Sequence, residues 1–173
     1  WVPSRAIPGD TITEFPAFTF LYADLHAHLI ALPITILAIA WIFSYFLEGG
    51  RSIQEKKWLD HIWTVLLGAI IIGALRPTNT WDFPTYLGMA VLVMLYTGIK
   101  QYGFLHEDLY NKAARHTFFA SIGSVLALVL FAFVLYMPFS DWYGQGYTSM
   151  RLWEGEHSPF WSYVTHWGLF LYV

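Results

Sequence analysis

A carboxylate and two imidazoles stand close together at the start of a long apolar run. Asp24, His26 and His28 lie in the segment ADLHAH, which leads into LIALPITILAIAWIF. In an extended segment all three side chains share one face, whereas in a helix only Asp24 and His28 do. Such a set can ligate a divalent metal, hold a phosphate or act as a general base with its partner. The simpler alternative is that they cap and anchor the helix, because an acid is favoured near a helix N-terminus.

A second polar group occupies RPTNTWDFP, a short connection between two apolar runs. Its candidate substrate-binding residues are Arg76, Asn79 and Trp81, and Asp82 is a candidate catalytic residue. Asp82 could pair with Arg76, or it could cap the next helix with Pro84 in the first turn. Capping explains Asp82 and Pro84, but it leaves Asn79 beside Trp81 unexplained.

Two weaker signals flank these groups. Glu14, in EFP, could fold back over the site of Asp24, although a solvated loop acid is the simpler interpretation. The segment SDWYGQGY holds Asp141 and Gln145 among aromatic rings. That composition suits sugar binding, but aromatic residues also gather at any membrane interface.

The elements that position these residues are expected to lie in a membrane. Of 173 residues, 57% are hydrophobic and 12% are charged, whereas soluble domains carry about 25% charged residues. Aromatic residues make up 20% of the chain, which suits interfacial belts. The net charge of −3 gives no indication of a nucleic-acid partner, and the chain has no cysteine for a disulfide.

Five apolar segments are candidates for the roughly 20-residue helices that cross a bilayer. They are 25–47, with a kink expected at Pro33, then 59–75, 85–99 with an extension to about 104, 117–139, and a fifth beginning at Trp161. We therefore predict an all-α polytopic transmembrane bundle over 25–173, preceded by an extracytoplasmic loop over 1–24. The first residue and the open apolar run at the end suggest part of a longer chain. Buried helices of a large soluble protein are disfavoured, because two segments reach spanning length without a charge.

Lysine and arginine in the connections predict the orientation of the chain. One set of connections holds Arg51, Lys56, Lys57, Lys100, Lys112 and Arg115, and the opposite set holds Arg5, Arg76 and Arg151. The first set is expected to be cytoplasmic. Asp24, Asp82 and Asp141 then lie on the extracytoplasmic side of the cell membrane.

Two motifs in order resemble a known family of very hydrophobic proteins. The chain has ITEFPAFTFLYADLHAH over 12–28 and NTWDFP over 79–84. Both resemble motifs of the YYY membrane protein family of Chloroflexi and archaea, whose domain has no established function. Ala27 departs from the family, which often has Pro there, and the tyrosine-rich motif that names the family is not in this chain. The match is strong over the first half of the chain and extends to the rest in hydropathy only.

The resemblance implies an activity, because the family is similar to the C-type membrane glycosyltransferases. Those enzymes take a sugar from a lipid-phosphate donor at the outer face, and an acidic residue acts as base or metal ligand. The residues carried over are Glu14, Asp24, His26, His28, Asn79 and Asp82. Asp24, Glu14 and Asp82 would be catalytic, Asp24, His26 and His28 could hold a divalent metal, and the histidines could instead hold the donor phosphate. Asn79 and Asp82 would orient the acceptor.

Another class of function remains open. The alternative is an accessory subunit of a larger membrane complex, such as one that contacts pigment or quinone, because histidines near helix ends can ligate such groups. A transporter is disfavoured, since the apolar segments lack charges at their centres. If the two motifs form one site, the Asp24 carboxylate should lie within about 10–12 Å of Asn79 or Asp82.

Overall fold

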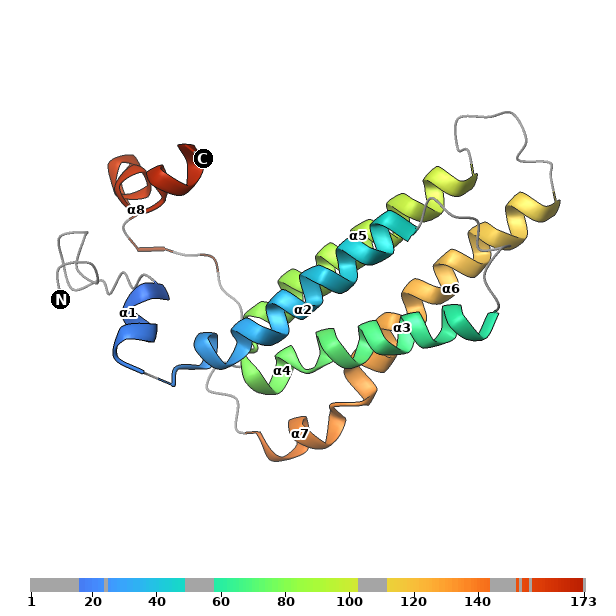
Figure 1. The fold of residues 1–173 in the computed structure, drawn as a ribbon, viewed down its shortest axis with the longest axis horizontal. Helices are drawn as coiled ribbons and strands as arrows, with labels where there is room; N and C mark the ends of the chain where they lie inside the picture. The colour runs from blue at the N-terminus through green and yellow to red at the C-terminus, as the bar shows by residue number, and fades with distance from the viewer. Residues whose placement is uncertain are drawn as a thin grey trace. The chain divides into compact units, whose positions relative to one another are not determined.

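The computed structural model describes residues 16–23, 25–48, 58–102, 112–143, 152, 154–155 and 157–172. Regular structure in these residues is entirely helical, as predicted (Figure 1). The helices are α1 (Pro16–Leu21), α2 (Ala27–Glu48), α3 (Trp58–Gly73), α4 (Leu75–Thr78), α5 (Asp82–Tyr102), α6 (Lys112–Val134), α7 (Met137–Trp142) and α8 (Phe160–Tyr172). Helix α1 falls in the segment predicted as a loop, of which residues 1–15 lie outside the described residues.

Four stretches are long and apolar enough to cross a membrane. They are Ala27–Glu48, Trp58–Thr78, Asp82–Lys100 and Phe118–Trp142. These stretches confirm four of the predicted segments, and α8 is a helix where the fifth was expected. In a bilayer a helix satisfies every backbone group within itself, which is why long apolar runs adopt this form. Helix α2 continues through Pro33, and the kink there stays a prediction.

The chain divides into two compact units. One consists of Trp1–Leu29 with Gly144–Val173, and the other is Ile30–Tyr143. The second unit contains most of α2 and all of α3 to α7, and we call it the bundle unit. The first contains α1, the first turn of α2 and α8, and we call it the terminal unit.

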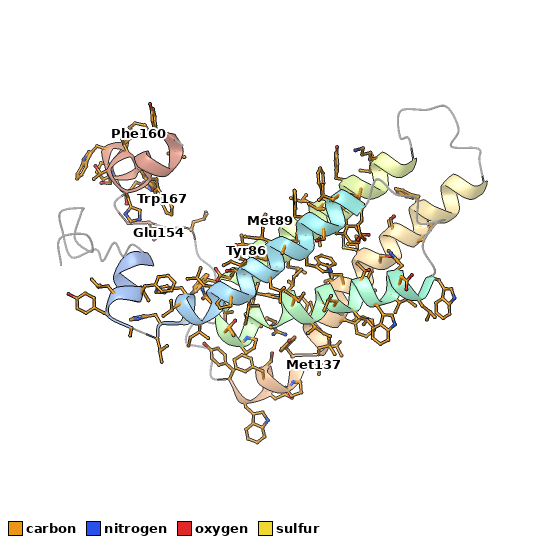
Figure 2. The ribbon with its side chains drawn as sticks, in the orientation of Figure 1. Tyr86, Met89, Met137, Glu154, Phe160 and Trp167 are labelled. Carbon is orange, nitrogen blue, oxygen red and sulfur yellow. The ribbon has the colours of Figure 1, made fainter. Side chains whose placement is uncertain are left out.

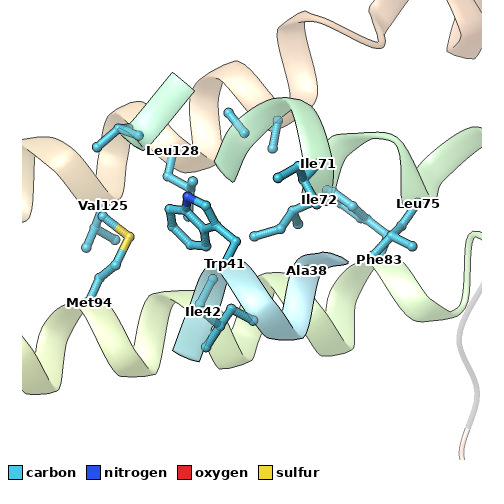
Figure 3. Packing of buried hydrophobic residues seen from close by; sticks show 14 of the residues in the cluster. Ala38, Trp41, Ile42, Ile71, Ile72, Leu75, Phe83, Met94, Val125 and Leu128 are labelled. Atoms are coloured by element: carbon cyan, nitrogen blue, oxygen red, sulfur yellow. The ribbon is translucent and has the colours of Figure 1, made fainter. Parts of the chain in front are cut away.

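Helices α3, α5 and α6 pack against one another in the bundle unit, and α2 contributes large side chains to the same core (Figure 3). Trp41 of α2 is buried there, and its indole Nε1 donates to the carbonyl of Thr64 on α3 at 3.0 Å. Large apolar side chains also cover the outside of the unit, such as Met89 of α5 and Met137 of α7 (Figure 2). An apolar core with an apolar exterior is the arrangement expected when lipid is the solvent.

Close approach within the bundle unit depends on two glycines of α3. A β-carbon on Gly68 would overlap the indole of Trp41. A β-carbon on Gly73 would lie 2.5 Å from Cε2 of Tyr136 and 2.9 Å from the carbonyl oxygen of Ala132 on α6. Small residues at such crossings are the usual means by which membrane helices come together, since lipid tails provide no hydrophobic drive between helices.

Gly73→Ala is therefore expected to destabilise the protein by about 1–3 kcal/mol, the usual cost of overpacking. The carbonyl of Ala132 is backbone and cannot turn away, so α3 and α6 must separate. Gly88→Ala of α5 is the matched control, because nothing lies within 4 Å of its added carbon. Thermal unfolding in detergent should show a lower midpoint for Gly73→Ala only. Equal midpoints for the two variants would contradict this packing.

Asp82 and Asp141 lie at one end of the helix pair α5 and α6, and Lys100 and Lys112 lie at the other. Asp82 begins α5, and Lys100 lies near its other end. Helices α5 and α6 pack side by side and run antiparallel, so that Lys112 at the start of α6 is at the Lys100 end (Figure 1). Asp141 lies in α7, which is bonded to α4 at the Asp82 end. Asp24, Lys56 and Lys57 lie outside the described residues, and the side of the membrane on which each group lies stays a prediction.

Single cysteines can test which end faces outward, because the chain has none of its own. The positive-inside bias leads us to expect that Asp141→Cys reacts with an impermeant thiol reagent added to intact cells. Lys100→Cys should react only after the cells are opened. Labelling of both positions from the same side would overturn the predicted topology.

Candidate functional site

The connection between α4 and α5 is a tight polar turn. The backbone N–H of Asn79 donates to the carbonyl of Leu75 at 2.8 Å, and that of Asp82 donates to the carbonyl of Asn79 at 3.0 Å. Pro77 has no N–H to continue the hydrogen bonds of α3, which accounts for the break near this point. The hydroxyl of Thr80 donates to the carbonyl of Arg76 at 3.0 Å. These bonds allow a short non-membrane segment to return directly into the next span.

Asn79 and Asp82 form a side-chain pair in this turn. The Asn79 amide Nδ2 donates to Oδ2 of Asp82 at 3.0 Å. Asp82 is the first residue of α5, so its carboxylate also lies at the positive end of the helix dipole. The pair explains why an asparagine precedes the acid. Trp81 beside it is 71% exposed and presents most of its indole at the surface of the unit.

Arg76 is bonded to α6 and α7 rather than to Asp82. Its guanidinium donates to Oγ of Ser140 at 2.7 Å and to the carbonyl of Phe133 at 3.3 Å. It also lies 4.9 Å from the ring centre of Phe133 and 5.6 Å from that of Phe83. The pairing with Asp82 considered from the sequence is therefore not the one that the structure shows. Within the described part of the chain, the charge of Arg76 has no carboxylate partner.

The two histidines of ADLHAH lie side by side in the terminal unit. Their ring centres are 5.5 Å apart and the ring planes are tilted by 30°. Nε2 of His28 lies 3.2 Å from Oγ1 of Thr19 on α1. Between the two helices, Ala23 adopts a left-handed backbone with φ of 51°, a conformation that costs roughly 1–2 kcal/mol for a residue with a β-carbon. The strained turn brings α1 back onto the start of α2.

Of the predicted metal ligands, the structure describes His26 and His28 but not Asp24. Among the described residues, no group of three or more His, Cys, Asp or Glu side chains could hold a metal ion. His26 and His28 alone provide two ligands, whereas a catalytic metal site normally has three from the protein. Asp24 and Glu14 lie outside the described residues. The described donor set thus does not make a metal site by itself, and the metal role of Asp24 stays a prediction.

Several partners of the candidate residues were not predicted from the sequence. Ser140, Phe133 and Phe83 surround Arg76, and Thr19 contacts His28. Phe83, Thr19 and Ser140 lie in segments already noted, but nothing in the sequence pairs them with these partners, and Ser140 is 64 residues beyond Arg76.

A second missed contact joins α3 to α6 through polar side chains. Nε2 of His61 lies 2.6 Å from Oγ of Ser124. The Ser124 hydroxyl donates to the carbonyl of Ala120 at 2.8 Å, so the histidine must be the donor in this contact. We assign this contact a structural role, because it joins α3 to α6.

Comparison with known proteins gives a family but no activity. A family model described as "Uncharacterized membrane protein (DUF2298)" matches residues 1–173. Neither a curated protein nor a solved structure matches the chain. The family description agrees with the four apolar spans.

Proposed function

This chain belongs to the DUF2298 family of uncharacterized membrane proteins, and we propose that it transfers a sugar from a lipid-phosphate donor at the membrane surface. The observation that carries the proposal is the environment of Arg76. A guanidinium held at one end of a membrane bundle, with its charge unmatched by a carboxylate in the described residues, suits a phosphate. An ionisable side chain at membrane depth lowers stability, so such residues usually have a functional role.

Arg76 is also held in place before any substrate arrives. Ser140 and the carbonyl of Phe133 each accept one hydrogen bond from it, and its Cζ lies over the rings of Phe133 and Phe83, at 4.9 and 5.6 Å from their centres. An arginine has five N–H donors, so three remain after these two bonds. A guanidinium that is held in one orientation and has unused N–H donors can bind two phosphate oxygens at once.

The proposed reaction needs one base and one stabilised leaving group. An acceptor hydroxyl oxygen attacks the anomeric carbon of the donor sugar, a new C–O bond forms, and the bond from that carbon to the phosphate oxygen breaks. The phosphate takes the bonding electrons and leaves with its lipid. The hydroxyl proton passes to a carboxylate, for which Asp24 is the proposed base. Arg76 offsets the charge on the phosphate, and Asn79 with Asp82 orients the acceptor.

The proposed site faces outward. The positive-inside bias assigns the Asp82 end of the bundle unit to the extracytoplasmic side, where a membrane-borne donor and an acceptor can meet. Glu14 is a second candidate base, and Trp81 is proposed to stack on a sugar ring.

The proposal requires that the two motifs approach each other. With cysteines at positions 24 and 82, a bis-maleimide of about 10–12 Å should cross-link the chain, the distance that one substrate can bridge. The matched control pairs position 24 with position 100, at the other end of α5. The cross-link is read as a mobility shift after proteolysis between the sites. Equal yields for the two pairs would argue against a shared site.

The direct test is transfer itself. Purified full-length protein in nanodiscs is incubated with a panel of radiolabelled hexose donors on prenyl phosphates, and the lipid-free products are separated. We expect label to leave the lipid fraction in an enzyme-dependent manner. No transfer from any donor across a broad acceptor panel would overturn the proposal.

A further inference from the structure

Thr19 is an unusual threonine in this protein. It is 1% exposed, and within the described residues its hydroxyl has only one hydrogen-bond partner, Nε2 of His28. Thr35 and Thr97 are also buried, and each donates to a backbone carbonyl of its own helix instead. Threonines in helices commonly make that local bond. The hydroxyl of Thr19 therefore forms its hydrogen bond with the imidazole of His28.

The direction of this hydrogen bond follows from burial. A buried hydroxyl proton without an acceptor costs about 1–3 kcal/mol. Because Thr19 is shielded from water and has no other partner in the described part of the chain, its proton must go to Nε2 of His28. A ring nitrogen that accepts a hydrogen bond carries no proton, so the neutral imidazole holds its proton on Nδ1.

We infer that His28 presents an Nδ1–H donor to a phosphate oxygen and does not ligate a metal. The imidazole is exposed, so its outer edge is accessible. A metal needs a nitrogen lone pair, yet one ring nitrogen is engaged by Thr19 and the other bears the proton. A phosphate offers only acceptors at this edge, which matches the donor. This role replaces the metal-ligand role predicted from the sequence, and its choice of ligand rests on the proposed lipid-phosphate substrate.

Nitrogen NMR of the full chain in detergent tests the tautomer without any substrate. Histidine ring nitrogens are labelled, and the His28 signals are assigned by their loss in His28→Asn. We expect a protonated Nδ1 and an unprotonated Nε2. Thr19→Val should abolish this preference, whereas Thr19→Ser should keep it. Thr35→Val is the control, because that hydroxyl bonds only to the carbonyl of Leu32. A protonated Nε2 in the unaltered protein would overturn the inference.

Calorimetry with two substitutions then tests the ligand. An asparagine amide can place an N–H near the position of Nδ1, whereas leucine cannot. His28→Leu should weaken binding of a short-chain prenyl phosphate about tenfold, the effect of one hydrogen bond to a charged group. His28→Asn should retain most of the affinity. Zinc binding that is lost equally in both variants would show a metal ligand and refute the assignment.

The same calorimetry with inorganic phosphate shows whether the lipid contributes to binding. Comparison with the transfer assay distinguishes a failure of this inference from a failure of the proposed reaction. If inorganic phosphate shows the same dependence on His28, the donor recognises the phosphate group alone. If only the prenyl phosphate does, the lipid contributes to recognition, and both results support the inference. Phosphate binding that depends on His28 in a protein that transfers no sugar would refute the proposed reaction and leave the inference standing. Loss of the His28 dependence in a protein that does transfer sugar would refute the inference alone.

Discussion

Asp24→Asn is expected to yield a full-length protein that inserts and purifies normally but transfers sugar about 10²–10⁴ times more slowly, the usual effect of losing a general base. Asparagine keeps the size and much of the hydrogen bonding of the acid, yet it cannot take the acceptor proton. Stability should change little, because a charge at a wet interface is well screened. The rate is measured as release of labelled sugar from the prenyl-phosphate donor, and stability as the unfolding midpoint in detergent.

Asp60→Asn is the matched control for this substitution. Asp60 is an exposed acid in the first turn of α3. Asp60→Asn should leave the transfer rate within a fewfold of the parent. The accessory-subunit hypothesis expects a different pattern, in which the parent transfers no sugar and Asp24→Asn alters assembly into a larger complex. That result would refute the proposed glycosyltransferase activity.

Arg76→Gln is expected to lower transfer about 100-fold, because it removes the cation that holds the phosphate and its hydrogen bonds, worth about 3 kcal/mol together. The loss should appear mainly in donor binding, measured by calorimetry with a prenyl phosphate. Arg76→Lys should recover only part of it. A lysine keeps the charge, but its single ammonium cannot replace the planar fork that reaches both Ser140 and Phe133.

Ser140→Ala separates binding from structure at this site. It removes the 2.7 Å bond from Arg76 to α7 and leaves the guanidinium charge in place. We expect a stability loss of about 1 kcal/mol with donor affinity changed only a fewfold. If Ser140→Ala and Arg76→Gln reduce affinity equally, Arg76 serves to attach α7, and the phosphate role fails.

The sequence by itself determined the helical architecture and the placement of the candidate polar groups along it. Apolar runs near 20 residues predicted the four spans, because a backbone in lipid must satisfy its own hydrogen bonds. Local rules offered Asp82 as a cap of the next helix with Pro84 in its first turn, and α5 begins at Asp82. Family motifs identified the same polar turns, and the family match over the whole chain agrees with a membrane protein.

Only the tertiary structure decided which atoms those polar groups face. The sequence offered the nearby Asp82 as one possible partner of Arg76, yet Arg76 is bonded to Ser140 on α7. The ring nitrogen that His28 leaves open depends on Thr19 of the adjoining helix, which lies in the same motif but whose contact with His28 the sequence did not reveal. Hydrophobic periodicity gives the face of a helix but not its rotation or its height against a neighbour. Hydrogen bonds depend on positions to within a few tenths of an ångström, so their partners are set by how the helices pack.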